Sequence, residues 1–327
     1  MYYKKILFLF LLFVFSFAYS QEGIPVYSDY LSDNYYLIHP SMAGAANCAK
    51  LRLTARRQWL GEEDAPSLQT LSFNGRISDR SGAGIILFND KNGYHSQKGV
   101  KLTYAYHILF SRDEIDLNQL SFGVNAGIIE NQLDQSTFQT FDPVISGDIT
   151  KDSYFNLDFG LSYNYLDSYA HFTVQSALET RRELYSEVES DNLRKYLLSV
   201  GHIFGNPEKL LWEPSVLFQL YDKTKERKID LNLKVFKNIN IGSIWAAISY
   251  RKSVDNTKNN DLTASQNLQY ITPILGINAK NFMFAYTYSQ IIGNVKFDSS
   301  PYHQITLGLN LFCREKRYDC YCPAINP

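Results

Sequence analysis

Residues 155–165 read FNLDFGLSYNY, and this stretch decides the fold. Its odd-numbered positions are all aromatic or Leu, whereas its even-numbered positions are Asn, Asp, Gly and Ser. Successive side chains of a β-strand point to opposite faces, so the segment separates an apolar wall from a wet interior. Between Ala49 and Phe312 the chain returns to this alternation in segments of roughly ten residues. The pattern predicts an up-and-down antiparallel transmembrane β-barrel.

The number of alternating segments predicts an even count of strands, about fourteen, as is typical of bacterial barrels. Long polar connections should alternate with short turns, because outer-membrane barrels carry long loops outside and short turns inside. The expected strand centres are Leu53, Phe73, Leu87, Tyr104, Val124, Leu161, Thr173, Val200, Phe218, Leu233, Ala247, Leu275, Ala285 and Leu309. The expected long connections are Asn131–Ser153, Leu178–Asp191 and Lys252–Asn267, and the short ones include 78–81, 167–168 and 279–281.

The N-terminus has the pattern of a secretory signal. Lys4 and Lys5 precede an apolar stretch, 6–18, which is too short to span a bilayer of ~30 Å, and the small residues of Ala18-Tyr19-Ser20 suit cleavage. We therefore expect a signal peptide at 1–20, a periplasmic or plug segment at 21–47, a barrel at 48–312 and a Cys-bearing periplasmic tail at 313–327. The residue directly after the expected cleavage site is Gln21 and not Cys, so no lipoprotein anchor is expected.

The composition agrees with an exported barrel in the outer membrane. The formal net charge is -1 and no basic stripe occurs, so nucleic acid is not an expected partner. The chain has 24 Tyr and 21 Phe, and Tyr suits the boundary between hydrocarbon and water. A soluble β-sandwich or propeller also alternates, but no blade-length repeat is found. The barrel is therefore expected to be surrounded by outer-membrane lipid.

Several residues have predicted structural roles. Ser28–Asn47, punctuated by Pro40 and Gly44, is expected to fold as a small plug or rim piece at the periplasmic mouth. Pro214 and Pro273 lie inside proposed strands, where each removes a ladder donor, so bulges or strand ends are expected there.

Arg52 and Arg56 alternate with apolar neighbours and should point into the lumen. In one interpretation, the two arginines pair with acidic lumen residues such as Asp158 or Asp230 and stiffen the barrel. In the other, the two arginines help to hold a bound polypeptide segment. Trp59, at the outer end of the first strand, is expected in the interfacial aromatic belt.

The four cysteines suggest disulfides. Cys48 precedes the first strand and Cys313 follows the last, and these strands are neighbours in a closed barrel, so a seam disulfide is expected. Cys320 or Cys322 could equally take Cys48, which would leave the remaining two cysteines to pair. A zinc site is the alternative, although the tail has no nearby His and no CxxC pair.

No catalytic constellation is present in the sequence, so no enzyme activity and no cofactor are expected. The six His are scattered singly, and no HExxH, GxSxG or P-loop pattern occurs. The acidic residues 62–64 are interpreted as a solvated turn. Glu183, Glu187, Glu189 and Asp191 are interpreted as a hydrated loop, with binding of a cation or a basic partner as the alternative.

Residues 36–44 read YLIHPSMAG and resemble the NPAYAG signature of the PorP/SprF family, outer-membrane proteins of the type IX secretion system of Bacteroidetes. Residues 57–61, RQWLG, resemble the RxQW-G element of that family, and 65–73 and 82–93 resemble its next two strands. The chain departs from the family pattern at His39, where Asn is usual, and in its Cys-bearing tail.

The resemblance implies a non-enzymatic barrel that binds a secreted cell-surface protein, such as a gliding adhesin, through the C-terminal domain of that protein. The implied partners also include the type IX translocon and periplasmic ring components. The residues alone leave a second interpretation, a passive porin or small-ligand transporter, because the predicted lumen is lined by polar side chains. Inward Tyr, His and Arg could instead fill that lumen.

Overall fold

The computed structural model describes residues 28–59, 65–110, 116–136, 148–179, 194–254, 268–292, 301–315, 320 and 324–325. Three short 3₁₀ helices, η1 (Ser28–Leu31), η2 (Tyr35–Leu37) and η3 (Pro40–Met42), precede the strands. Within this part of the chain, no helix is long and apolar enough to cross a membrane. The strands are β1 (Ala49–Gln58), β2 (Ser67–Arg76), β3 (Ser81–Asn92), β4 (His95–Leu109), β5 (Asn118–Asp134), β6 (Ile149–Tyr165), β7 (Ser168–Gln175), β8 (Lys195–His202), β9 (Phe204–Asn206), β10 (Leu210–Tyr221), β11 (Arg227–Ile239), β12 (Gly242–Ser253), β13 (Gln269–Ala279), β14 (Phe282–Ile292) and β15 (Tyr302–Leu311).

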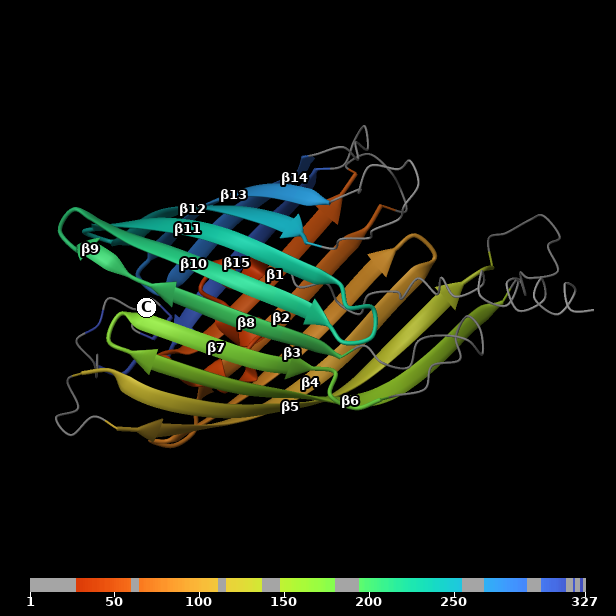
Figure 1. The fold of residues 1–327 in the computed structure, drawn as a ribbon, viewed down its shortest axis with the longest axis horizontal. Coiled ribbons are helices and arrows are strands. Elements are labelled where there is room, and N and C mark those ends of the chain that lie inside the picture. Colours follow the sequence, from red (N-terminus) through yellow and green to blue (C-terminus); the bar gives the residue numbers. More distant parts are fainter. Residues whose placement is uncertain are drawn as a thin grey trace, which may run out of the picture.

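The strands form one closed antiparallel barrel, shown in Figure 1. Each strand pairs with its neighbours in sequence, and β1 pairs with β15 over ten residue pairs to close the sheet. Both β8 and β9 pair with β10 in one register, so they form a single strand position and the barrel has 14 strands. Every strand centre expected from the sequence lies inside a strand, so the predicted fold is confirmed.

The two ends of the barrel differ in their connections. The end that carries Cys48 and Cys313, here called the termini end, has turns such as 166–167, 240–241 and 280–281. The opposite end, here called the loop end, has the connections 135–148, 176–194 and 254–268. The asymmetry is incomplete, because the β3–β4 turn at 93–94 is also at the loop end. Most residues of the predicted long loops lie outside the described part of the chain.

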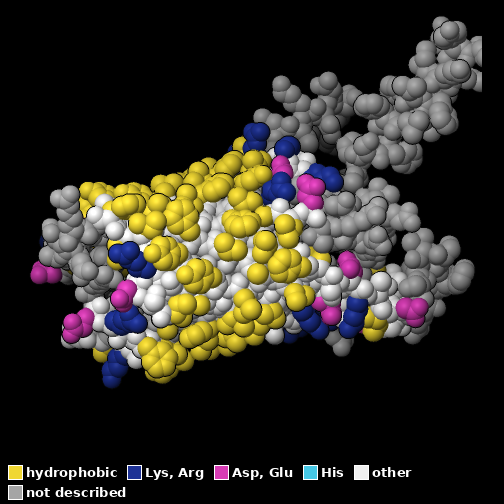
Figure 2. Space-filling model, turned by 90° about the horizontal axis from the view of Figure 1, so that it is seen from below, with side chains coloured by type: hydrophobic (Ala, Val, Ile, Leu, Met, Phe, Trp, Pro, Cys, Tyr) yellow, Lys and Arg dark blue, Asp and Glu magenta, His cyan; other side chains and the backbone are white. Residues whose placement is uncertain are grey.

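Alternation sorts the side chains between an apolar outside and a polar inside. In β1, Leu53 is 46% exposed on the outer wall, whereas its neighbour Arg52 is 2% exposed inside. Figure 2 shows apolar side chains across the middle of one face of the barrel and charged side chains toward its two ends. Because no backbone amide can stay unpaired in lipid, a half-apolar sheet of this kind needs the closure that the β1–β15 ladder gives.

The prediction of bulges or strand ends at the two prolines is wrong for the strands that carry them. Pro214 lies inside β10 and Pro273 inside β13, and both strands continue without a register change. Each proline interrupts only one ladder. The β8–β10 pairing stops at Gly201 and resumes at Phe204, and the β13–β14 pairing skips Pro273 and its neighbour Thr272. Proline lacks an N–H, so a gap on one side of the strand is sufficient.

Residues 29–46 lie inside the barrel and form what we call the plug. Nearly all of these residues are buried, and η3 contacts β4, β5 and β6. The plug reaches from Gly44, which lies against the termini end of β2 and β3, to Asp29, which contacts Arg56 near the loop end of β1. The predicted plug is therefore present, but it extends deep into the lumen and is not confined to the mouth.

Wall glycines make room for the plug backbone. A Cβ at Gly123 would lie 2.3 Å from the backbone of Pro40, and one at Gly82 would lie 2.0 Å from the carbonyl oxygen of Ala43. No real Cβ contact is that short, and neither plug contact is with a flexible side chain that could turn away. The sequence of the wall is thus matched to the plug.

Gly123→Ala should therefore loosen the plug while β5 stays in the sheet. Overpacking of this kind costs about 1–3 kcal/mol, so amide exchange of residues 29–46 should accelerate by roughly ten- to a hundredfold. Hydrogen exchange by mass spectrometry in detergent measures this. Gly99→Ala is the control, because its Cβ would meet the ring of Phe88, a side chain, and no plug residue. Equal exchange in both variants would refute the match between wall and plug.

Candidate functional site

The plug is held by buried charges of opposite sign. Asp29 forms an ion pair of 2.9 Å with Arg56, and Asp33 forms one of 2.6 Å with Lys234. Burial alone would raise the pKa of Asp33, but the positive charge of Lys234 lowers it, so the carboxylate is ionised. The Lys234 ammonium also lies 4.3 Å from the ring centroid of Trp245, a cation–π distance. Each plug acid thus has its own cation on the wall.

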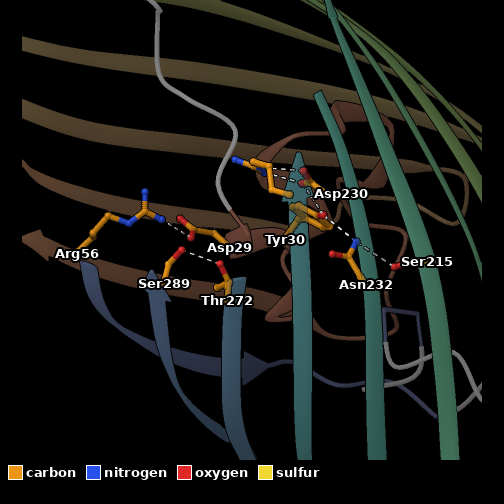
Figure 3. A network of polar contacts seen from close by, with 9 residues as sticks. Asp29, Tyr30, Arg56, Ser215, Asp230, Asn232, Thr272 and Ser289 are labelled. Carbon is orange, nitrogen blue, oxygen red and sulfur yellow. Dashed lines mark hydrogen bonds and ion pairs between the residues drawn. The ribbon is translucent and has the colours of Figure 1, made fainter. Parts of the chain in front are cut away.

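Tyrosine hydroxyls connect the plug to further carboxylates of the wall. Tyr30 donates to Asp230 at 3.1 Å, and Asn232 donates to the Tyr30 hydroxyl. Figure 3 shows this network on the inner faces of the strands, together with the pair of Asp29 and Arg56. Asp230 is itself paired with Arg251 at 2.6 Å. Asp230 therefore has the positive charge of Arg251 beside it while it accepts the hydrogen bond from Tyr30 of the plug.

A second group of hydrogen bonds joins the η2 segment of the plug to the wall. Tyr35 donates to Glu213 at 2.9 Å, and Tyr169 donates to the same carboxylate oxygen at 2.7 Å. The two hydroxyls are also 2.7 Å apart. Tyr36 contacts the hydroxyl of Thr103 at 2.6 Å. These bonds attach η2 to three separate strands, β4, β7 and β10, so the plug is fixed on more than one side of the lumen.

His39, where the sequence departs from the motif that it resembles, has both ring nitrogens bonded. Nδ1 lies 2.8 Å from the Thr173 hydroxyl and Nε2 lies 2.8 Å from the Ser199 hydroxyl. Burial lowers the pKa of His39 well below its usual range, and electrostatic repulsion from a second proton on nearby His171 lowers it further. The imidazole is therefore neutral, with one nitrogen donating and the other accepting.

Arg52 and Arg56 both point into the lumen, as predicted, but the predicted pairing with Asp158 or Asp230 is wrong. Arg52 donates to the carbonyl oxygens of Leu51 and Leu309 and to the side chain of Asn310. Arg56 pairs with Asp29 of the plug. The two acids named in that prediction pair with other cations of the wall: Asp158 of β6 with Lys101 of β4, and Asp230 of β11 with Arg251 of the adjacent β12.

Trp59 follows β1 at the loop end and is 38% exposed. An exposed indole at a strand end is compatible with the expected aromatic belt. Its role there remains a prediction.

The termini end carries a disulfide and contacts with the described part of the tail. Cys48 and Cys313 form the seam disulfide across the β1–β15 ladder, as expected. Beyond it the chain returns to the rim. The Asn47 N–H donates to the carbonyl of Ile325, and Lys50 donates to that of Ala324. Ile325 is 1% exposed and Cys320 is buried in the same apolar cluster as the plug, whereas Cys322 lies outside the described residues.

No metal site is evident in the described part of the chain, where no group of three or more His, Cys, Asp or Glu side chains is arranged to hold an ion. The acidic residues 62–64 and 183–191 lie outside the described residues, so their interpretation remains a prediction.

Sequence reasoning missed the contacts that hold the plug. The pairing of Lys234 with Asp33 was not expected. The sequence contained one clue. The short segment between the expected signal peptide and the barrel includes the acidic residues Asp29 and Asp33, and the strands have several cations on their inward faces. The partners are separated by some 200 positions for Lys234 and Asp33, which periodicity cannot connect.

A closed antiparallel barrel with an apolar outer wall, a polar inner wall and an internal plug is an outer-membrane β-barrel fold. Residues 19–309 match the family described as "Type IX secretion system membrane protein PorP/SprF". Because the match covers most of the chain, this protein belongs to that family, and the resemblance of residues 36–94 is confirmed.

Comparison with solved structures returns outer-membrane barrels at low sequence identity. The CymD monoaromatic hydrocarbon channel has 9% identity and a TM-score of 0.49, with 84% of this chain and 90% of that chain covered. The TodX channel deltaS2 mutant has 11% identity and a TM-score of 0.47, with coverage of 85% and 93%. BamA from Haemophilus ducreyi, lacking POTRA domains 1-3, has 10% identity and a TM-score of 0.42, with coverage of 81% and 70%. No curated protein matches the chain in sequence.

Proposed function

We propose that this protein is a docking component of type IX secretion. It binds a secreted cell-surface protein, such as a gliding adhesin, through the C-terminal domain of that protein and presents it for export or anchoring at the translocon. The termini end faces the periplasm, where the type IX ring components lie, and the loop end faces outward. The protein is not an enzyme in this proposal.

The observation that carries the proposal is the occupied lumen. Plug residues bond to strands on several sides of the barrel, through Asp29, Tyr35 and His39 among others, and residues 324–325 of the tail bond to the rim at the termini end. A conduit for a polypeptide would need that space. A barrel filled by its own chain offers its mouth and connections for binding, and loops on a rigid scaffold are the usual place for recognition.

The plug also argues against the alternative of a passive porin. Porins with an aqueous channel have 16–18 strands and a wide lumen, whereas barrels near 8 strands are filled by side chains. This barrel has 14 strands, so its lumen has room for residues 29–46. With those residues in place, docking is the better supported function.

Deletion of residues 137–147 or of residues 181–192, which belong to two loop-end connections, should abolish surface display of the cognate protein. Both deletions remove residues from connections that were predicted to be long and polar, Asn131–Ser153 and Leu178–Asp191, and polar loop surface beside a rigid mouth suits recognition of a large partner. Surface proteolysis or antibody labelling of intact cells measures display.

Deletion of residues 256–266, a segment as long as the first, is the control and should leave display intact. Membrane extraction and heat-modified gel migration show whether each variant is inserted and folded. Normal display after removal of both recognition segments would contradict the placement of the docking surface.

A further inference from the structure

The outer wall becomes polar at one level near the loop end of β3, β4 and β5. The last apolar side chains there are Leu87, Val100 and Ile128, which are cross-strand neighbours and are 37%, 43% and 64% exposed. Toward the loop end, the next two outward positions on each strand are polar. They are Asn89 and Lys91 on β3, Lys98 and Ser96 on β4, and Glu130 and Gln132 on β5.

The distance from the apolar edge places these polar side chains at lipid headgroup level. Two residues of a strand span ~6.7 Å, and a tilt of about 45° leaves about 5 Å of height for each step. The headgroup zone extends about 5–8 Å beyond the hydrocarbon on each side of the membrane. Lys98 falls within that zone, and Lys91 lies one step further, within reach of its long side chain.

A hollow of 370 Å³ lies between these side chains on the outward face. It is lined by Lys91 and Lys98 with Asn89, Tyr94, Ser96 and Gln132. Lys91 and Lys98 are diagonal neighbours across the β3–β4 ladder, since Asn89 pairs with Lys98 and Lys91 pairs with Ser96. Diagonal neighbours are ~7–8 Å apart, so both ammonium groups can reach one anion.

Two carboxylates lie near the lysines, since Glu130 is the cross-strand neighbour of Lys98 and Asp134 lies within the electrostatic reach of Lys91. Asp134, which also lines the hollow, accepts hydrogen bonds from the backbone and the hydroxyl of Ser136 at 3.1 and 2.6 Å. Glu130 lies 3.8 Å from Lys151 on β6. The hollow is lined by two exposed lysines and one carboxylate, and it also offers amide, hydroxyl and phenol groups. Its excess of positive charge and its neutral polar groups are chemistry for a phosphate attached to a sugar.

We propose that this hollow binds the phosphorylated sugar headgroup of a glycolipid in the outer leaflet, with its acyl chains on the apolar row below. The ammonium groups of Lys91 and Lys98 bind the phosphate, and Asn89, Ser96 and Gln132 bind sugar hydroxyls. The row of Leu87, Val100 and Ile128 contacts the chains. This site rests on the outward orientation of the loop end in the proposed function.

The test uses the full-length protein in detergent, titrated with diphosphorylated lipid A and followed by native mass spectrometry. Lys91→Gln/Lys98→Gln should weaken lipid A binding by about tenfold, because two charge-assisted contacts are lost. Lys223→Gln/Lys225→Gln is the matched control, since these exposed lysines lie in the β10–β11 connection at the same end. The control should bind like the wild type.

Three further probes separate the sources of phosphate. Dephosphorylated lipid A should bind about tenfold more weakly, millimolar inorganic phosphate should not displace lipid A, and phosphatidylglycerol should bind more weakly than lipid A. Equal lipid A binding by the lysine variant and the control overturns the site. Displacement by inorganic phosphate, or preference for phosphatidylglycerol, overturns the glycolipid assignment. No secreted protein takes part, so these results are independent of the loop deletions that test docking.

Discussion

Cells that carry the barrel without residues 29–46 should become permeable to hydrophilic solutes. The inward faces of the strands are lined by side chains such as Thr54, Ser72, Asn125 and Ser249, which are buried in the intact protein. Removal of the plug exposes this polar wall to water, and among the described residues no other segment then crosses the middle of the 14-stranded lumen. Uptake of a small hydrophilic dye by whole cells measures the effect.

The comparison needs the deleted barrel in the membrane at the level of the intact protein. Heat-modified gel migration should be retained, because strand pairing does not involve the plug. If the deleted barrel inserts and folds but cells stay as impermeable as with the intact protein, the plug is not what occupies the lumen.

Asp33→Asn should loosen the plug by leaving Lys234 buried without its partner charge. Asp33 has a φ of 57°, and Asn tolerates this left-handed conformation, so the substitution removes charge with little backbone cost. Removal of one partner from a buried pair costs about 3 kcal/mol or more. Amide exchange of residues 29–46 should then accelerate on the order of 10²-fold.

The second substitution Lys234→Gln should restore protection in the Asp33→Asn background, because a neutral amide pair needs no compensating charge. A double variant that exchanges as fast as Asp33→Asn alone would show that the pair does not hold the plug. Lys225→Gln serves as the control, since Lys225 is an exposed lysine of the β10–β11 connection that pairs with Asp222 and not with a plug residue.

The barrel was predictable from sequence because its signal is local. The alternation of residues 155–165 and of the other segments identifies the face of each side chain without any knowledge of its neighbours. Antiparallel neighbours in an up-and-down barrel are also neighbours in sequence, so strand order follows from strand count. Closure then placed Cys48 beside Cys313, which is why the seam disulfide could be predicted.

The interior could not be predicted in the same way, because its contacts are between residues far apart in the chain. Arg56 was expected inside, but its partner Asp29 lies in a segment without periodicity. Likewise, Pro214 was expected to end or distort its strand, since a sequence cannot show that the lost donor faces only one of two ladders. Short 3₁₀ turns such as η1 and η2 have no repeating pattern that identifies them in advance.

Planar-bilayer conductance of the intact purified protein tests the central claim most directly. With residues 29–46 bonded to the wall and the tail at the termini end, the reconstituted protein should show no steady open current over the voltages at which the deleted barrel conducts. A stable open pore in the intact protein would contradict a plugged docking barrel and would support the passive porin.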